Sequence, residues 1–189
     1  IFPLFAKTGK AHFSPEGNGL YYVLNENGTG NVFFMDLDTG EEQRITSHLA
    51  DDQLGRLAIH PEGTFIAFAR FEEDGKRHIV VLNRETGFER VLTNPDQDDR
   101  YPLWNHDGTL LAYTSLRDHV PNVFVINPFD ENATEERITA LFAGGTALQW
   151  LQPDSLHEAG TMVLTGSDTK RDNHIHRIDA SRRAEDLQL

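Results

Sequence analysis

The stretch NHDGTLLAYTS, residues 105–115, joins a tight turn to a short apolar run, as in a strand that leaves a reverse turn. Related stretches occur twice before it, SPEGNGLYYVL at residues 14–24 and HPEGTFIAFAR at residues 60–70. The turn glycines of the three copies, which can supply the positive φ of a tight turn, lie 46 and 45 residues apart: Gly17, Gly63 and Gly108. The turn and its strand are therefore one unit of a repeat.

A second marker recurs with the same period. The sequences QRIT, RVLT and RIT follow the three turns, and their threonines are 47 and 46 residues apart: Thr46, Thr93 and Thr139. A weaker fourth copy begins at LQWLQPD, where Trp150 lies 46 residues after Trp104. Because two independent markers share one period, we read the chain as four units of about 46 residues.

Each unit contains four short segments rich in β-branched and aromatic residues, separated by turn residues, whereas no stretch of about 12 residues has helical periodicity with caps. Four strands in a repeat of this length are typical of a propeller blade. The sequence thus predicts an all-β fold, a β-propeller of four-stranded antiparallel blades. We expect a single domain over residues 1–189, with blades at about 11–56, 57–101, 102–147 and 148–189. An immunoglobulin-like sandwich would have no reason to repeat one turn at this spacing.

Large apolar residues recur at one position of the repeat, and we expect them to form the core between blades: Phe13, Ile59, Trp104 and Trp150. In the third strand of the fourth unit, Arg177 stands where the other units have Phe or Val. Burying an unpaired arginine is costly, so that face is expected to be wet or to line a site. Closing a ring with four blades needs about 90° per blade, and Arg177 favours the alternative, a part of a larger propeller.

The pattern P-x-W-x-x-D-G-x-x-[LI]-A-[YF]-[TS]-S, followed by N-x-[FY]-V and R-[IL]-T, resembles the TolB-type propeller repeat. Its clearest copy runs from residue 101 to residue 139. Similar repeats occur in TolB and in the amino-terminal propellers of prolyl oligopeptidase and dipeptidyl peptidase relatives. The resemblance covers three units well; the fourth departs from it, with Asp154 and Ser155 in place of the turn glycine. It implies the fold, and a periplasmic or secreted location with a cytoplasmic one as the alternative.

The charge balance narrows the choice of partners. Seventeen basic and 30 acidic residues give a net charge of −13, which repels nucleic acid and anionic lipid.

No apolar run approaches the roughly 18 residues that a membrane span needs. The chain contains no cysteine, so it has neither a disulfide nor a thiolate metal site. It starts at Ile1 without a signal-like segment, which suggests a processed product or an excised segment. We expect a protein or peptide partner, self-association of an open ring, or further blades in the parent protein.

Acidic pairs fall in equivalent loops before the first strands of the second and third units: Asp51 and Asp52, and Asp98 and Asp99. In a propeller such loops run along one rim of the axial channel, where focused negative potential could hold a cation or a basic peptide. Solvated loop carboxylates are the alternative. We predict that neighbouring residues of the same loops also contact the partner, because Tyr and Arg often dominate interfaces: Arg56, Arg100 and Tyr101.

His174 and His176 are two residues apart, so on a strand both side chains would point to one face and could reach a metal ion. The stretch DNHIHRI faintly resembles oligogalacturonate lyases, which are propellers with a histidine-bound metal. Two ligands are too few for a metal site, and surface histidines are the alternative. No other cofactor is predicted.

The sequence lacks the G-x-S-x-G elbow of α/β-hydrolases, and LTGSDTK around Ser167 does not fit it. We therefore predict no catalytic residues and a non-catalytic propeller module that binds a protein or peptide. The first alternative is the substrate-gating propeller of a serine peptidase of the dipeptidyl or acylaminoacyl peptidase type, with its catalytic domain outside this sequence. The second is a metal-dependent sugar-processing propeller like the oligogalacturonate lyases.

Overall fold

The computed structural model describes residues 11–26, 28–49, 54–117, 119–139, 144–152, 161–167 and 173–179. Its described part contains strands and turns and no helix. No segment there has the helical length and apolarity that a membrane crossing requires. The strands form four antiparallel sheets, each with its strands in the order of the chain. The predicted all-β fold is confirmed.

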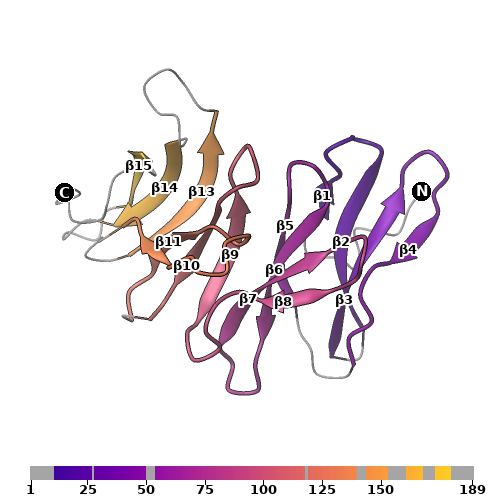
Figure 1. Cartoon of the computed structure of the whole chain (residues 1–189), viewed down its shortest axis with the longest axis horizontal. Helices are drawn as coiled ribbons and strands as arrows, with labels where there is room; N and C mark the ends of the chain where they lie inside the picture. Colours follow the sequence, from indigo (N-terminus) through magenta and orange to yellow (C-terminus); the bar gives the residue numbers. More distant parts are fainter. Residues whose placement is uncertain are drawn as a thin grey trace. The chain divides into compact units, whose positions relative to one another are not determined.

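The chain divides into two compact units, residues 1–96 and 97–189, and each holds two sheets (Figure 1). The first sheet consists of β1 (Ala11–Phe13), β2 (Gly19–Glu26), β3 (Thr29–Asp36) and β4 (Glu42–Arg44). The second sheet consists of β5 (Leu54–Ile59), β6 (Phe65–Phe71), β7 (Arg77–Asn83) and β8 (Glu89–Val91).

In the second unit, the third sheet consists of β9 (Asp99–Trp104), β10 (Leu111–Ser115), β11 (Asn122–Ile126) and β12 (Glu136–Arg137). The fourth sheet has three strands in the described part: β13 (Gly145–Leu151), β14 (Thr161–Ser167) and β15 (Asn173–Asp179). The first strands β5, β9 and β13 begin at residues 54, 99 and 145, before the blade boundaries expected at 57, 102 and 148.

Within each unit the two sheets pack face to face through an apolar core. The core of the first unit contains Tyr21, Val23, Val32, Leu54, Leu57, Ile66, Phe68, Val80 and Leu82. The core of the second unit contains Ala112, Val123, Val125, Ile138, Ala147, Trp150, Met162, Leu164 and Ile178. The middle strands β10 and β11 are buried along their whole length. These sheets therefore bury apolar side chains against each other as propeller blades do.

The recurrent threonine explains the second sequence marker. In the first three sheets its Oγ1 accepts a hydrogen bond from a backbone N–H of the third strand, at 2.8 to 3.0 Å: Thr46 from Val32, Thr93 from Ile79 and Thr139 from Val123. Thr46 and Thr139 also donate to the side chain of a buried asparagine in the third strand, Asn31 and Asn122. The threonine thus continues the ladder where the short fourth strand ends.

The second sheet varies this arrangement. His78 stands at the asparagine position and is buried, with its Nδ1 2.7 Å from Oε1 of Glu72. The turn glycines behave as the sequence predicts, because Gly17, Gly63 and Gly108 all have φ between 72° and 75°.

The recurrent apolar position is mostly buried, with one exception. Trp104 and Trp150 are 6% and 3% exposed, and Ile59 packs against the core of the first unit. Trp150 also donates its indole N–H to the Leu103 carbonyl of the preceding sheet, at 3.2 Å. Phe13 is 70% exposed, so the prediction was wrong there. Ile59 and Trp150 face the preceding sheet of their unit, whereas no sheet precedes β1 in the described part.

Candidate functional site

Asp98 and Arg100 lie together at the start of β9, where they form an ion pair with each other. Arg100 Nε donates to Asp98 Oδ1 at 3.0 Å, and its NH2 group contacts Oδ2 of the same carboxylate. This hydrogen bond raises the pKa of the Arg100 guanidinium, against the opposing effect of burial. The two charges largely cancel, so Asp98 contributes less negative potential to this loop than the sequence suggests.

Asp99 lies inside the protein instead of on the loop surface. It is 0% exposed, and its Oδ1 is 3.8 Å from an NH2 nitrogen of Arg117. Arg117 in turn donates to Glu135 Oε2 at 2.6 Å and to Ser115 Oγ at 2.9 Å, and its guanidinium lies 3.9 Å from the Phe124 ring centre. Asp99 is therefore a buried member of a charged cluster with Arg117 and Glu135.

The cluster around Arg117 shifts the pKa values of Arg117 and Tyr113. Burial alone would lower the pKa of Arg117, but the hydrogen bond to Glu135 and the neighbouring charges raise it overall. Burial, helped by Glu135, raises the pKa of the Tyr113 hydroxyl above its usual range. Arg117 therefore stays charged and Tyr113 stays neutral at ordinary pH. Arg117 and Glu135 carry no sequence signal as site residues, because their pairing joins segments 18 residues apart.

Tyr101 is the exposed aromatic residue of this loop, and its backbone is unusual. Its φ is +57°, which residues other than glycine seldom adopt, and the residue is 39% exposed. The pairing of β9 with β10 skips between Ala112 and Thr114, so Tyr101 and Pro102 lie opposite Tyr113 alone. Such a bulge redirects side chains and is frequent next to functional sites.

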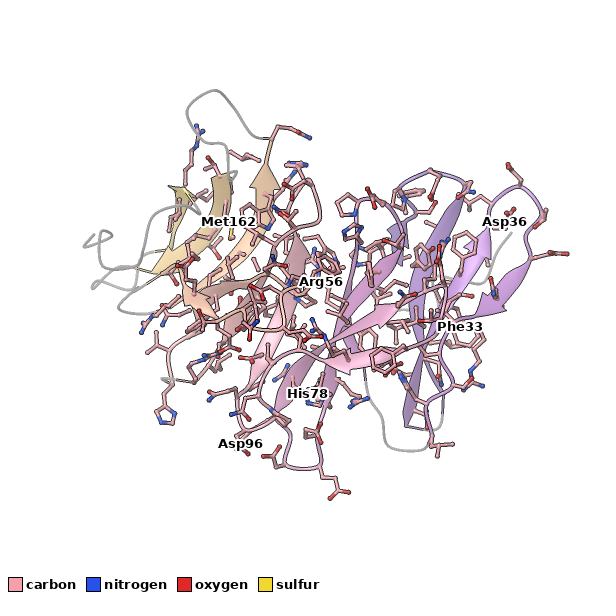
Figure 2. The ribbon with its side chains drawn as sticks, in the orientation of Figure 1. Phe33, Asp36, Arg56, His78, Asp96 and Met162 are labelled. Carbon is pink, nitrogen blue, oxygen red and sulfur yellow. The ribbon has the colours of Figure 1, made fainter. Side chains whose placement is uncertain are left out.

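The same irregularity recurs in the other long first strands. The register of β5 against β6 skips between residues 54 and 57, and that of β13 against β14 skips between residues 147 and 149. Arg56 lies in the bulge of β5 and is half-buried (Figure 2). The structure therefore places Arg56 and Tyr101 in comparable bulges of two different sheets.

The remaining predicted site residues belong to the loop before β5 and to β15. Asp51 and Asp52 lie outside the described residues. His174 and His176 belong to β15, where their backbones pair with Gly166 and Leu164, but their side chains are not among those described. Among the described residues, no group of three or more His, Asp or Glu could hold a metal ion. Arg177 is exposed, so its face is wet as predicted.

The first unit contains a pocket of about 450 Å³ that the sequence analysis did not anticipate. Its lining comes from the first sheet and from the β7–β8 turn of the second: Glu16, Asn18, Tyr21, Phe34, Gln43, Ile45, Arg84 and Glu85. In an antiparallel order the β1–β2, β3–β4 and β7–β8 turns share one end of the sheets, and the connections between sheets lie at the other. Figure 2 shows these ends, marked by Asp36 and His78. The pocket is at the Asp36 end of the first unit.

Comparison with solved structures places this chain among propellers. TolB from Acinetobacter baumannii superimposes with a TM-score of 0.73 at 19% identity, over 92% of this chain and 41% of TolB. An oligogalacturonate lyase from Vibrio parahaemolyticus gives 0.70 at 14% identity, over 92% of this chain and 51% of the lyase. A prolyl endopeptidase gives 0.68 at 10% identity, over 94% of this chain and 28% of the enzyme. No family model matches the sequence.

These similarities confirm the fold that the TolB-type repeat implies. At such identities they show the fold alone, and two of the names state different activities, those of a lyase and of an endopeptidase. The chain also spans about half or less of the length of each of these proteins.

Proposed function

We propose that this chain is a non-catalytic β-propeller module that binds a protein or peptide through the start of β9. We call Asp98, Arg100 and Tyr101 the β9 surface. The observation that carries the proposal is Tyr101, an aromatic side chain that stays exposed although its backbone has φ +57°. Strained backbone of this kind persists where function requires it, and Tyr and Arg are the residues that most often dominate protein interfaces.

The ion pair with Asp98 supports this role for Arg100. Two contacts to one carboxylate hold the guanidinium in a fixed orientation, so less side-chain entropy is lost when a partner packs on it. Arg56 occupies the comparable bulge of β5 and is proposed as a contact of the same kind. Asp51, Asp52 and Asp99 remain proposed contacts on sequence grounds, and Asp99 is buried beside Arg117.

We further propose that residues 1–189 form one propeller domain within a larger propeller and that the protein is periplasmic or secreted. The exposed Phe13 supports the larger propeller, because the equivalent residues Ile59 and Trp150 pack against a preceding sheet. The likeness to TolB supports the binding role and the location.

Site-directed photocross-linking tests the β9 surface. A benzoylphenylalanine in place of Tyr101 should give one dominant adduct in an extract of the source cells, and excess unlabelled protein should suppress it. The same group at Thr109, in the exposed β9–β10 turn, is the control. Once the partner is purified, Tyr101→Ala should weaken its binding by about 30-fold, as expected for an interface anchor. Identical adducts from both positions, or unchanged binding of Tyr101→Ala, would refute the proposal.

The likeness to a prolyl endopeptidase keeps the substrate-gating propeller as a second candidate. It requires a hydrolase domain, so the reading frame beyond Leu189 decides between the two: a G-x-S-x-G elbow there would favour the peptidase. The likeness to an oligogalacturonate lyase supports the sugar-processing alternative with His174 and His176 at a metal. Elemental analysis of the purified protein tests that alternative, which needs stoichiometric metal.

A further inference from the structure

We propose that the pocket of the first unit receives one basic side chain, arginine or lysine, of an extended peptide. The pocket lies in a different sheet pair from the β9 surface, so the inference does not depend on the proposed function. Its volume of about 450 Å³ is in the range of small-ligand sites and suits one long side chain.

Two carboxylates of the lining lie on hydrogen-bonded turns, one from each sheet of the unit. Glu16 belongs to the β1–β2 turn, which is fixed by a hydrogen bond of 3.1 Å from the Gly19 N–H to Ser14 Oγ. Glu16 reaches the second sheet: a Cβ added to Gly63 would lie 3.3 Å from its Oε1. Neither Glu16 nor Glu85 forms an ion pair within the described part of the chain.

Glu85 belongs to the β7–β8 turn. Asn83 Oδ1 accepts the backbone N–H groups of Glu85 and Thr86, both at 3.0 Å. The Arg84 N–H donates to the Thr64 carbonyl, also at 3.0 Å, which ties this turn to the β5–β6 turn. Both turns are therefore preformed, so little ordering of the backbone is needed when a ligand enters.

The floor of the pocket is aromatic. The rings of Tyr21 and Phe34 lie 4.9 Å apart between centres, and Phe34 is partly exposed. Phe34 lies directly over Gly19, since a Cβ at Gly19 would come within 2.1 Å of its ring. An aromatic face attracts a cation, and the ring together with Ile45 can pack against the methylene stem of Arg or Lys.

The charge of the pocket selects a cation over an anion. Glu16 and Glu85 oppose the single cation of the lining, Arg84, and the whole chain carries −13. Arg84 is already engaged, because its NH1 group contacts the Tyr21 hydroxyl and its guanidinium lies 6.0 Å from the Tyr21 ring centre. With Arg84 included, the lining carries a net charge of −1, which repels an incoming carboxylate overall and attracts an ammonium or guanidinium that can also lie against the Phe34 ring.

Short acetylated and amidated peptides test the ligand class. Gly-Arg-Gly and Gly-Lys-Gly are compared with Gly-citrulline-Gly, which has nearly the same shape as the arginine peptide but no charge, by titration of amide NMR signals at low salt. We expect the charged peptides to shift signals of the β1–β2 and β7–β8 turns and the citrulline peptide to bind at least about tenfold more weakly. Equal binding of the citrulline peptide, or no binding of either charged peptide, would overturn the proposal.

Variants test the site. Glu16→Gln and Glu85→Gln should each weaken the arginine peptide by about fivefold, as expected for an exposed charge pair. Glu62→Gln is the matched control. The variant removes the same charge, and Glu62 holds the position of Glu16 in the β5–β6 turn but does not line the pocket. It should leave binding within about twofold.

The Arg84→Gln variant tests whether the pocket binds a cation or an anion. It should leave the binding of the arginine peptide unchanged or strengthen it. If instead a Gly-Glu-Gly peptide binds and Arg84→Gln abolishes that binding, the pocket takes an anion and the proposal is wrong. An effect of Glu62→Gln as large as that of Glu85→Gln would mean that the net charge of the chain, and not the pocket, attracts the peptide.

Discussion

Tyr101 has a backbone conformation, φ +57°, that is unfavourable for any residue with a Cβ atom. An L-residue in the left-handed region costs roughly 1 to 2 kcal/mol, which glycine avoids. We therefore predict that Tyr101→Gly is more stable than Tyr101→Ala by about 1 kcal/mol, as measured by urea unfolding. At Arg100, whose φ is not positive, the order should reverse, because glycine in a strand is less stable than alanine by roughly 0.5 to 1 kcal/mol. An Ala variant that is the more stable at both positions would contradict the strain.

The environment of Tyr22 predicts that the unfolding free energy falls at alkaline pH. Burial, with help from Glu42, raises the pKa of Tyr22 from 10.0 to about 12. The folded state then holds the phenolic proton more tightly than the unfolded chain does. The stabilisation is complete below pH 10 and is lost as the pH rises from about 10 to about 12. Between about pH 9 and 11.5, Tyr22→Phe should lose less of its unfolding free energy than the wild type, by on the order of 1 to 2 kcal/mol. Equal losses would show that Tyr22 ionises as freely in the folded protein.

At the scale of the element, the threonine after the fourth strand contributes hydrogen bonds whose effect on stability can be measured. Thr139→Val keeps the shape but removes the acceptor of the Val123 N–H and the donor to Asn122. The unfolding free energy should fall by about 1 to 3 kcal/mol, the cost of leaving buried polar groups unsatisfied. Thr139→Ser should lose less, and the exposed Thr134→Val should change stability by less than about 0.5 kcal/mol. An equal loss in the Ser variant would point to packing of the methyl group instead.

This role also explains which elements were predictable. Gly108 and Thr139 act within one sheet, through a turn and a single ladder bond, so each recurs in the sequence of the first three copies of the repeat. The burial of Asp99 leaves no such mark, because it depends on Arg117 and Glu135, which two other segments supply. The pocket was equally hidden, since Glu16 and Glu85 come from different repeats and meet only after the sheets pack. Phe13 was misjudged because the repeat records a residue type and not whether a neighbouring sheet is present.

At the scale of the whole molecule, each unit has its own core, which predicts that their unfolding can be followed separately. Both tryptophans, Trp104 and Trp150, belong to the second unit, so fluorescence reports that unit while circular dichroism reports both. Phe68→Ala, in the core of the first unit, should cost about 3 to 5 kcal/mol there. We expect it to move the dichroism midpoint in urea and to leave the fluorescence midpoint nearly unchanged. A common shift of both midpoints would show that the units unfold as one.

The recurring bulge makes the propeller adjustable. The backbone irregularity recurs within β5, β9 and β13, while the residue types at the irregularity differ from one sheet to the next. Under the proposed function, sequence change at these places would alter which partner is bound without disturbing the scaffold. Exchanging Arg56 and Tyr101 would be a rational first step toward giving the module a new target.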